Sequence, residues 1–430
     1  MERRKKNWPV IALAAVTLIL AVGLAGVLIF LKNQPPQVRG FQPLTQLAAM
    51  EPDLAQWGVN FPNEYSSLLL TQTNHQRTTF GGSEPFSKLL ADPRLVRLFA
   101  GYSFSKEYNE DRGHLNSLID VRSTKRVNDK TPGTCYSCKS ADNPKLWSEM
   151  GMAQFDQTPF AQLTPKIQQP IGCANCHEAN TMKLVVTNPA LDAALKAQGK
   201  DWHTFTRQEM RTVVCANCHV EYYFDGEGKL LTFPWKDGTN IDQIEQYYTE
   251  INFSDWQHPD SGAAMVKMQH PDYELYTANS THYQAGVSCA DCHMPYLREG
   301  ATKYSSHDVK SPLLNPSPSC GVCHTDVEYV IGRVQKIQEQ VNTSMGATED
   351  ALVAAIDAIA KAGAKQEADP ALLEAARGLH RNAQMRWDFI AAENSMGFHN
   401  PEEALRILAS ATDLARQAEL KAYQAVSGGE

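Results

Sequence analysis

The ten cysteines of this 430-residue chain form five Cys-x-x-Cys pairs, and the residue after each pair divides them four to one. C-x-x-C-H is the attachment signal for c-type haem, in which two thioethers hold the porphyrin and the adjacent imidazole ligates the iron. Four pairs have this form: Cys173, Cys176 and His177; Cys215, Cys218 and His219; Cys289, Cys292 and His293; Cys320, Cys323 and His324. The fifth is Cys135 and Cys138 followed by Lys139. The sequence therefore predicts five covalently bound haem c groups, one of them with an amine ligand.

Zinc and disulfide bonds are the other common uses of paired cysteines. Zinc takes cysteine pairs two at a time in tetrahedral groups, which would leave one pair over. Disulfides suit an extracytoplasmic chain, but they do not require a histidine at the same place four times. Haem attachment explains the whole pattern. For the fifth pair, a structural disulfide beside a solvated Lys139 is the competing interpretation.

An amine ligand would set the haem at Lys139 apart from the other four. A free lysine has a pKa of about 10.4, so iron must displace a proton, and burial against porphyrin helps because it disfavours the charged ammonium. An iron with an open sixth position can bind a small substrate, whereas a six-coordinate iron mostly relays electrons. We therefore expect the chemistry at Lys139 and electron transfer at the other haems.

Nine histidines remain once the four motif histidines are set aside: His75, His114, His203, His258, His270, His282, His307, His380 and His399. Four of these nine would complete bis-histidine coordination of the other four haems. Spacing along the chain does not identify which four, and the remainder would by default be surface residues.

The region that must hold the haems, residues 46–326, is turn-rich and only weakly periodic. Its Cys pairs begin 38, 42, 74 and 31 residues apart, so no repeat of fixed period is present. We expect a pentahaem catalytic region in which the polypeptide wraps the haems with little regular secondary structure.

Residues 327–430 differ because apolar residues recur there at helical spacing. Asp369-Pro370 and Asn400-Pro401 are expected helix starts, with proline at the first helical position. The fold class is thus predicted to be mainly α, with low regular structure around the haems and three long C-terminal helices. Their Ala-rich stripe could also serve as a dimer seam.

The N-terminus predicts a membrane segment. A basic stretch (residues 1–8) precedes an apolar run (residues 9–31) that is long enough to cross a bilayer. The basic stretch is expected to stay cytoplasmic, and the run is longer than the apolar part of a typical cleaved signal peptide, so an uncleaved anchor is favoured. A short stiff linker (residues 32–45) follows. The remainder is then extracytoplasmic, and its net charge of −8 argues against a nucleic-acid partner.

Several local motifs match one known family: Asp92-Pro-Arg-Leu, Gly101-Tyr-Ser-Phe-Ser, Arg112-Gly-His114, Cys135–Lys139, Cys215–Phe224, Lys267-Met-Gln-His-Pro271 and His399-Asn-Pro-Glu-Glu. Through them the chain resembles, from about Leu89 onward, the ammonia-forming pentahaem cytochrome c nitrite reductases (the NrfA family). The resemblance implies a dissimilatory nitrite reductase that converts nitrite to ammonium at the lysine-ligated haem, fed by four bis-histidine haems.

The same resemblance implies roles for particular residues. Lys139 would be the proximal ligand of the catalytic haem, and Arg126, Tyr222 and His270 would line the pocket on its other face. Arg122 is the competing candidate for the pocket arginine. Without the family, Tyr222 would be a core aromatic residue, His270 a loop histidine and Arg126 part of a solvated charge run.

The resemblance also implies a calcium ion and the remaining haem ligands. Calcium would be bound by oxygen atoms only, as Ca²⁺ prefers: the carboxylate of Glu221, the main chain of Tyr222 and Lys267, and the side chain of Gln269. The distal imidazoles for the second, third, fourth and fifth haems, counted along the chain, would be His307, His114, His399 and His282.

Partners follow from the resemblance as well. They are nitrite, a membrane quinol-oxidising multihaem cytochrome as electron donor, and a second copy of the chain in a homodimer built on the final helices. Two other functions stay open. One is an electron-transfer multihaem cytochrome with no substrate of its own, and the other is reduction of hydroxylamine or sulfite in the same pocket.

Overall fold

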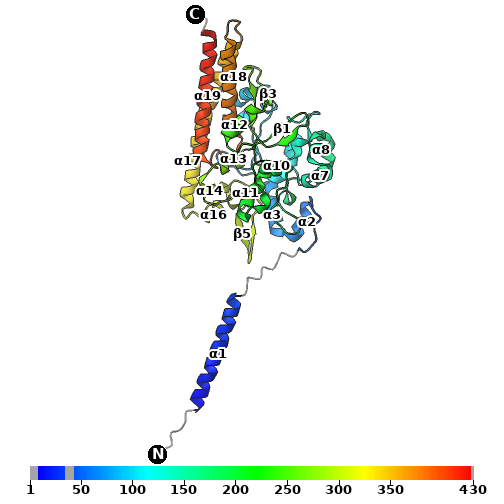
Figure 1. Cartoon of the computed structure of the whole chain (residues 1–430), viewed down its shortest axis with the longest axis vertical. Coiled ribbons are helices and arrows are strands. Elements are labelled where there is room, and N and C mark those ends of the chain that lie inside the picture. The colour runs from blue at the N-terminus through cyan, green and yellow to red at the C-terminus, as the bar shows by residue number, and fades with distance from the viewer. Residues whose placement is uncertain (1–7, 34–42, 428–430) are drawn as a thin grey trace, which may run out of the picture. The chain divides into compact units, whose positions relative to one another are not determined.

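The computed structural model describes residues 8–33 and 43–427 (Figure 1). The chain divides between Pro43 and Leu44 into two compact units, each described by itself. The basic residues Arg3–Lys6 and the Pro-rich part of the expected linker, residues 34–37, lie outside the described residues.

The described part of the first unit forms helix α1 (Trp8–Asn33), whose sequence is uncharged and almost wholly apolar up to Leu31. Its stretch Trp8–Leu28 has a mean hydropathy of 2.7, and none of it is buried by the rest of the chain. At 1.5 Å of rise per residue, about 20 residues span the roughly 30 Å hydrocarbon core of a bilayer. By length and composition, α1 can therefore cross a membrane.

The second unit is built mostly from short elements up to residue 326, which agrees with the expected wrapping of cofactors. The α-helices are α2 (Leu54–Asn60), α3 (Pro62–Thr73), α4 (Lys88–Ala91), α5 (Arg94–Leu98), α6 (Ser117–Ser123), α7 (Asn143–Met150), α8 (Met152–Gln157), α9 (Phe160–Leu163), α10 (Pro189–Ala197), α11 (Arg207–Val213), α12 (Ile241–Glu250), α13 (Asp272–Thr277), α14 (Thr281–Gln284), α15 (Cys289–His293) and α16 (Pro316–Ser319).

Short 3₁₀ turns and three hairpins complete this region. The turns are η1 (Ser103–Ser105), η2 (His114–Asn116), η3 (Gly133–Tyr136), η4 (Thr164–Lys166), η5 (Cys173–Asn175), η6 (Trp202–Thr204), η7 (Val214–Asn217) and η8 (Pro312–Leu314). The antiparallel pairs are β1 (Tyr223–Asp225) with β2 (Leu230–Thr232), β3 (Trp256–Gln257) with β4 (Ala264–Met265), and β5 (Tyr296–Glu299) with β6 (Thr302–Ser305).

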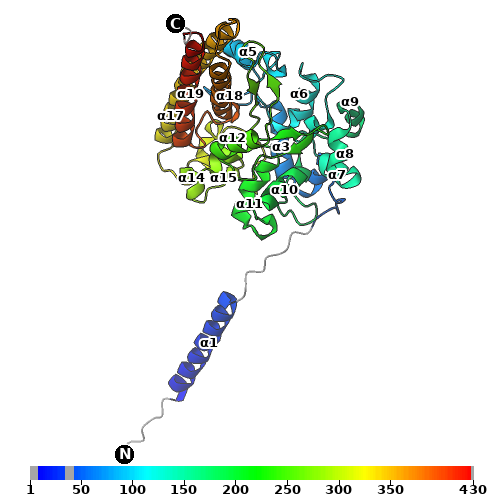
Figure 2. The ribbon, with the colours of Figure 1, turned by 45° about the horizontal axis from the view of Figure 1, so that its top comes forward.

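Three long helices follow, as predicted: α17 (Val327–Gly363), α18 (Pro370–Ala392) and α19 (Pro401–Ser427). They lie side by side along one edge of the unit (Figures 1 and 2). Asp369 caps α18 by accepting hydrogen bonds from Ala371 and Leu372 N–H, and Pro370 and Pro401 occupy the expected first positions. Proline is favoured there because the first-turn N–H groups have no intrahelical acceptor.

Helix α18 is the innermost of the three. Every residue from Ala383 to Ile390 is buried, which is typical of a helix enclosed on all sides. One hydrophobic cluster runs without a break from Leu95 and Phe99 through Trp256 and Met268 into the three helices. The long helices and the cofactor region therefore share a core, which holds the segments near residues 221 and 268 in place.

Candidate functional site

We call the five Cys motifs stations and number them along the chain: station 1 (Cys135–Lys139), station 2 (Cys173–His177), station 3 (Cys215–His219), station 4 (Cys289–His293) and station 5 (Cys320–His324). In stations 2, 3 and 5 the histidine N–H donates to the carbonyl of the first cysteine at 2.9 Å, and station 4 forms helix α15. In station 1, Lys139 N–H instead donates to Tyr136 O. Because positions i, i+3 and i+4 share one face of a helical turn, both thiols and the ligand project to the same side.

All ten cysteine thiols are free, so no disulfide joins Cys135 to Cys138. The stations do not follow one another in space as they do in sequence. The Cys138 thiol of station 1 contacts Cys218 of station 3, and Cys215 of station 3 contacts Cys289 of station 4. Station 3 therefore lies between stations 1 and 4.

The histidines predicted as ligands face one another in four pairs. Their ring centres are separated by 6.3 Å for His177–His307, 6.4 Å for His114–His219, 6.3 Å for His293–His399 and 6.4 Å for His282–His324. Two imidazoles that ligate one metal from opposite sides, each through a metal–nitrogen bond of about 2 Å, have ring centres roughly 6 Å apart. The four spacings fit bis-histidine haem.

The Nδ1 atoms of these histidines divide into two groups. Backbone carbonyls lie at 2.9–3.0 Å from three of them: Met182 O from His177, Lys310 O from His293, and Ser305 O from His307. Carboxylates approach two others: Asp272 lies 3.2 Å from His219, and Glu393 lies 3.2 Å from His399. Such outer partners orient a ligating imidazole and increase its basicity.

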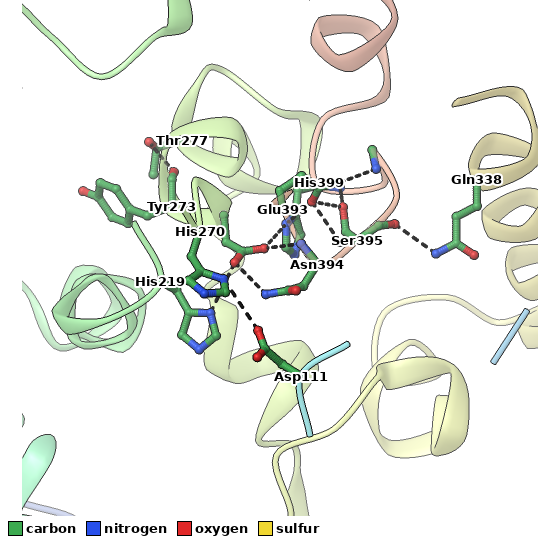
Figure 3. Close-up of polar contacts among 12 residues, drawn as sticks. Asp111, His219, His270, Tyr273, Thr277, Gln338, Glu393, Asn394, Ser395 and His399 are labelled. Carbon is green, nitrogen blue, oxygen red and sulfur yellow. Dashed lines mark hydrogen bonds and ion pairs between the residues drawn. The ribbon is translucent and has the colours of Figure 1, made fainter. Parts of the chain in front are cut away.

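The histidines beside carbonyls and those beside carboxylates differ in the direction of their pKa shift. Burial lowers the pKa of His177 and His293 to about 4. Burial also acts on His399, but there the hydrogen bond and charge of Glu393, with the charge of Asp272, outweigh it and raise the pKa to about 9. The pKa of His219 is likewise raised, because Asp272 outweighs burial. Figure 3 shows His219, Glu393 and His399 within this polar network.

His270 is a second neighbour of His219, with ring centres 6.4 Å apart. Since Nδ1 of His219 contacts Asp272, only its Nε2 is left to bind a metal, and one metal on that atom accepts one opposite partner. His114 is the partner that the family resemblance implies. His270 instead points its Nδ1 toward Asp111, at 3.7 Å (Figure 3).

Lys139 is half-buried, and within the described residues its ammonium forms no hydrogen bond or ion pair. It lies near enough to His114 and His270 for its charge to lower the pKa of both, in addition to burial. An amine without a competing partner in the protein is suited to bind a metal.

Of the two candidate pocket arginines, Arg122 is occupied elsewhere. Its Nε donates to Tyr136 Oη at 3.1 Å, and its Nη2 donates to Ile167 O at 2.5 Å and Thr164 O at 3.2 Å. These bonds connect α6 to the loop after α9, so Arg122 supports the local fold.

Arg126 has the opposite environment. Its guanidinium carbon lies 4.2 Å from the ring centre of Phe104, and its Nε donates to Thr124 Oγ1 at 3.2 Å. Nη1 and Nη2 have no hydrogen-bond partner in the described part of the chain. Its charge acts on Tyr222 and on Cys135 of station 1. The structure thus brings Arg126, not Arg122, to the tyrosine and the lysine-bearing station.

Tyr222 and His270 belong to two segments that are hydrogen-bonded to each other. His270 N–H donates to Val220 O at 3.3 Å, and Gln269 N–H donates to a Glu221 carboxylate oxygen at 2.6 Å. Burial lowers the pKa of His270 to about 4, and nearby Asp111 only partly opposes this. His270 is therefore neutral at pH 7, and an anion bound beside it would raise its pKa.

The predicted calcium residues lie together in the same two hydrogen-bonded segments as Tyr222 and His270. Glu221 is fully buried; Tyr248 Oη donates to its other carboxylate oxygen at 2.8 Å, and no basic side chain pairs with it among the described residues. The Gln269 side-chain amide is 3.3 Å from Lys267 O. Burial raises the pKa of Glu221 well above its usual value, so a divalent cation would stabilise its ionised form. The donor set fits Ca²⁺.

The side chain of Lys267 is separately satisfied. Its ammonium is buried, donates to Asp388 Oδ1 at 2.9 Å, and lies 4.8–5.3 Å from the ring centres of Phe99, Phe104 and Tyr108. Phe104 thus contacts two cations, Lys267 and Arg126. Cation–π contacts of this kind contribute about 0.5–2 kcal/mol each, which helps to fix the arginine.

The structure adds residues that sequence reasoning did not single out: Phe104, Asp111, Tyr248, Asp272 and Glu393. The sequence could have indicated two of them: Asp272 directly follows His270-Pro271, and Phe104 lies in the family motif Gly101-Tyr-Ser-Phe-Ser. Among the unassigned histidines, His75 and His203 are exposed as expected. The expectation of a surface position is wrong for His258 and His380, which are buried because hydrogen bonds to Arg97 O, Ser261 and Gln384 satisfy their rings.

Comparisons with known proteins agree with one another. The family model of cytochrome c552 matches residues 53–429. Proteins named cytochrome c-552 from Parabacteroides distasonis and Bacteroides fragilis are each 38% identical to this chain, with 98% of the chain and 87% of the relative covered. Among solved structures, a cytochrome c nitrite reductase from Desulfovibrio desulfuricans, described with two calcium sites, is similar with a TM-score of 0.85 at 35% identity, over 90% of this chain and 89% of that one.

Proposed function

The chain belongs to the cytochrome c552 family, and on that basis we propose that it reduces nitrite to ammonium, with six electrons and eight protons consumed and two waters released. The observation that carries this function is station 1. There an amine with no other partner, Lys139, replaces the imidazole of the other stations, and Arg126, Tyr222 and His270 gather near it.

Five haem c groups and Ca²⁺ are the cofactors. Stations 1 to 5 would hold the haems, with His114, His282, His307 and His399 as the second ligands of four of them. When bound at Lys139, haem supplies an iron that can take nitrite through nitrogen and pass electrons to it.

The chain's own residues bind the anion and supply protons. Arg126 offers two unpartnered terminal nitrogens to the nitrite oxygens, a charge-assisted contact that strengthens as negative charge develops on a departing oxygen. His270 holds a proton at one ring nitrogen and is placed to donate it, and its pKa rises when the anion is bound. Tyr222 supplies a second hydroxyl donor. Glu221, Tyr222, Lys267 and Gln269 would hold Ca²⁺, which adds positive potential.

Nitrite titration of the reduced holoenzyme tests this function. We expect an optical change from one haem of five and ammonium release at a fixed ratio to electrons consumed. An electron-transfer cytochrome would show no anion-dependent change. A hydroxylamine or sulfite reductase would show higher kcat/KM for that substrate than for nitrite.

The two arginines should respond differently to removal of charge. Arg126→Gln should lower kcat/KM for nitrite by at least about tenfold, because one charge-assisted hydrogen bond is worth roughly 1.5–3 kcal/mol, and it should lower Tm less than Arg122→Gln does. Arg122→Gln should lower Tm, because its hydrogen bonds to Tyr136, Thr164 and Ile167 are lost. Its kcat/KM should stay nearly intact. The reverse pattern, in steady-state kinetics and thermal melts, would make Arg122 the pocket residue.

Calcium binding should depend on one of two neighbouring buried carboxylates. Glu221→Gln should reduce the calcium content, measured by atomic emission, from one ion per chain toward zero, and turnover should fall with it. Glu274→Gln is the matched control: burial raises the pKa of Glu274 to about 8, so an amide replaces a group that is already mostly neutral. Equal calcium loss in both variants would contradict the assignment of Glu221.

We infer that α1 remains as a membrane anchor with the enzyme on the outer, periplasmic side, where a membrane quinol-oxidising multihaem cytochrome would supply electrons. Exposed Tyr329 on α17, with Leu420 and Tyr423 on α19, supports a homodimer through the long helices. The intact mass of the mature protein and its mass by light scattering test these two statements.

A further inference from the structure

One buried carboxylate contacts ligands that belong to two different stations. Asp272, at the start of α13, is 8% exposed. Its Oδ2 lies 3.2 Å from Nδ1 of His219, the histidine of station 3. Its Oδ1 lies 3.5 Å from Nδ1 of His399, which faces His293 of station 4.

The orientation of this carboxylate is held from a third side. Asn394, just after α18, donates to Asp272 Oδ1 through its backbone N–H at 2.8 Å and to Oδ2 through its side chain at 3.0 Å. Figure 3 shows Asn394 in the same polar network as Glu393, His399 and His219. Both oxygens are therefore held in place: Oδ2 is hydrogen-bonded to His219, and Oδ1 lies within ion-pair distance of His399.

Among the described residues, no carboxylate contacts Nδ1 of a ligand histidine at stations 2 and 5. Where the remaining ligand histidines have an Nδ1 acceptor in the described residues, it is a backbone carbonyl, at His177, His293 and His307. Glu393 is a second carboxylate, but among the ligand histidines of the described residues it contacts only His399. Stations 3 and 4 are also neighbours, since Cys215 contacts Cys289.

We propose that Asp272 is a positioning residue shared by two haems, and that its negative charge lowers the reduction potentials of the haems at stations 3 and 4 together. A carboxylate at Nδ1 makes a ligating imidazole a stronger donor, which stabilises oxidised over reduced iron. Partial burial strengthens the effect because the local dielectric constant is low.

The consequence for electron delivery to station 1 rests on the proposed function. Station 3 contacts station 1 through Cys218 and Cys138. A lower potential at stations 3 and 4 favours movement of each electron toward station 1, with one site oxidised as the other is reduced. The charge of Asp272 thus favours electron transfer from stations 3 and 4 to station 1, where the substrate is bound.

Potentiometric titration of the holoenzyme, followed optically and by low-temperature EPR without nitrite, tests the proposal. Asp272→Asn preserves the shape but removes the charge, so two haem midpoints should shift upward by comparable amounts. Glu393→Gln should shift one of those same two, and Asp272→Glu should restore both most of the way. Haem content per chain is measured alongside.

A shift of one haem only, or none, in Asp272→Asn would overturn the proposal. If Asp272→Asn binds fewer than five haems, Asp272→Glu decides: its displaced charge should move both midpoints upward by a smaller amount, and a one-haem change would again overturn it. Because no substrate is present, these outcomes are independent of whether nitrite is reduced.

Discussion

Replacement of Lys139 by histidine should leave five haems attached but lower nitrite turnover by at least about 100-fold, more than the 10- to 100-fold loss typical of outer-shell partners. The change converts station 1 into C-x-x-C-H, so the attachment signal is complete. The ligand becomes an imidazole in place of an amine that has no back-donating ring. Haem counting by mass, the optical spectrum of the reduced protein and steady-state turnover measure the effect.

Lys130→His is the matched control for this variant. Lys130 is an exposed lysine in the turn that precedes station 1, so its replacement should change neither the spectrum nor turnover. If Lys139→His retained the turnover of the parent protein, the amine would have no special role, and the assignment of chemistry to station 1 would fail.

Replacement of His270 by asparagine should slow turnover by about 10²–10⁴-fold, the usual contribution of a positioned acid or base. Asparagine keeps a hydrogen-bond donor of similar size but cannot release a proton. The loss should appear mainly in kcat, because Arg126 still binds the anion. Haem and calcium contents should remain at the parent values, since the side chain of His270 is assigned to neither cofactor.

His203→Asn provides the control, because His203 is an exposed histidine whose side chain, among the described residues, pairs with Asp201 and stacks on Trp202. Parent-like kcat in His270→Asn would remove His270 from the mechanism. A loss of one haem would instead indicate that His270, and not His114, pairs with His219, the alternative that their 6.4 Å spacing allows.

The local sequence predicted those features of the structure that form within a single turn or helix. Asp369-Pro370 and Asn400-Pro401 begin helices because capping and proline geometry act within about four residues. In the same way, each Cys motif forms one turn that places two thiols and the ligand on one side. The cysteine pair and the lysine of station 1 are of this kind, since their chemistry is present in the residue types.

The arrangement of the stations is a property of the tertiary structure. The four C-x-x-C-H motifs indicate that four imidazoles need a partner, but spacing along the chain does not show which of the nine other histidines they are. Only packing places His307 opposite His177, 130 residues away in the sequence (307 − 177). Packing likewise places station 3 between stations 1 and 4.

The sequence by itself determined the chemistry available to this protein: five attachment turns, one amine among four imidazoles, and three terminal helices. Tertiary structure alone decided that Arg126 stays available while Arg122 is bonded into the fold, and that Asp272 reaches two histidines at once. The physical reason is range: a turn is set by hydrogen bonds between near neighbours, whereas these contacts depend on how distant segments share one buried core.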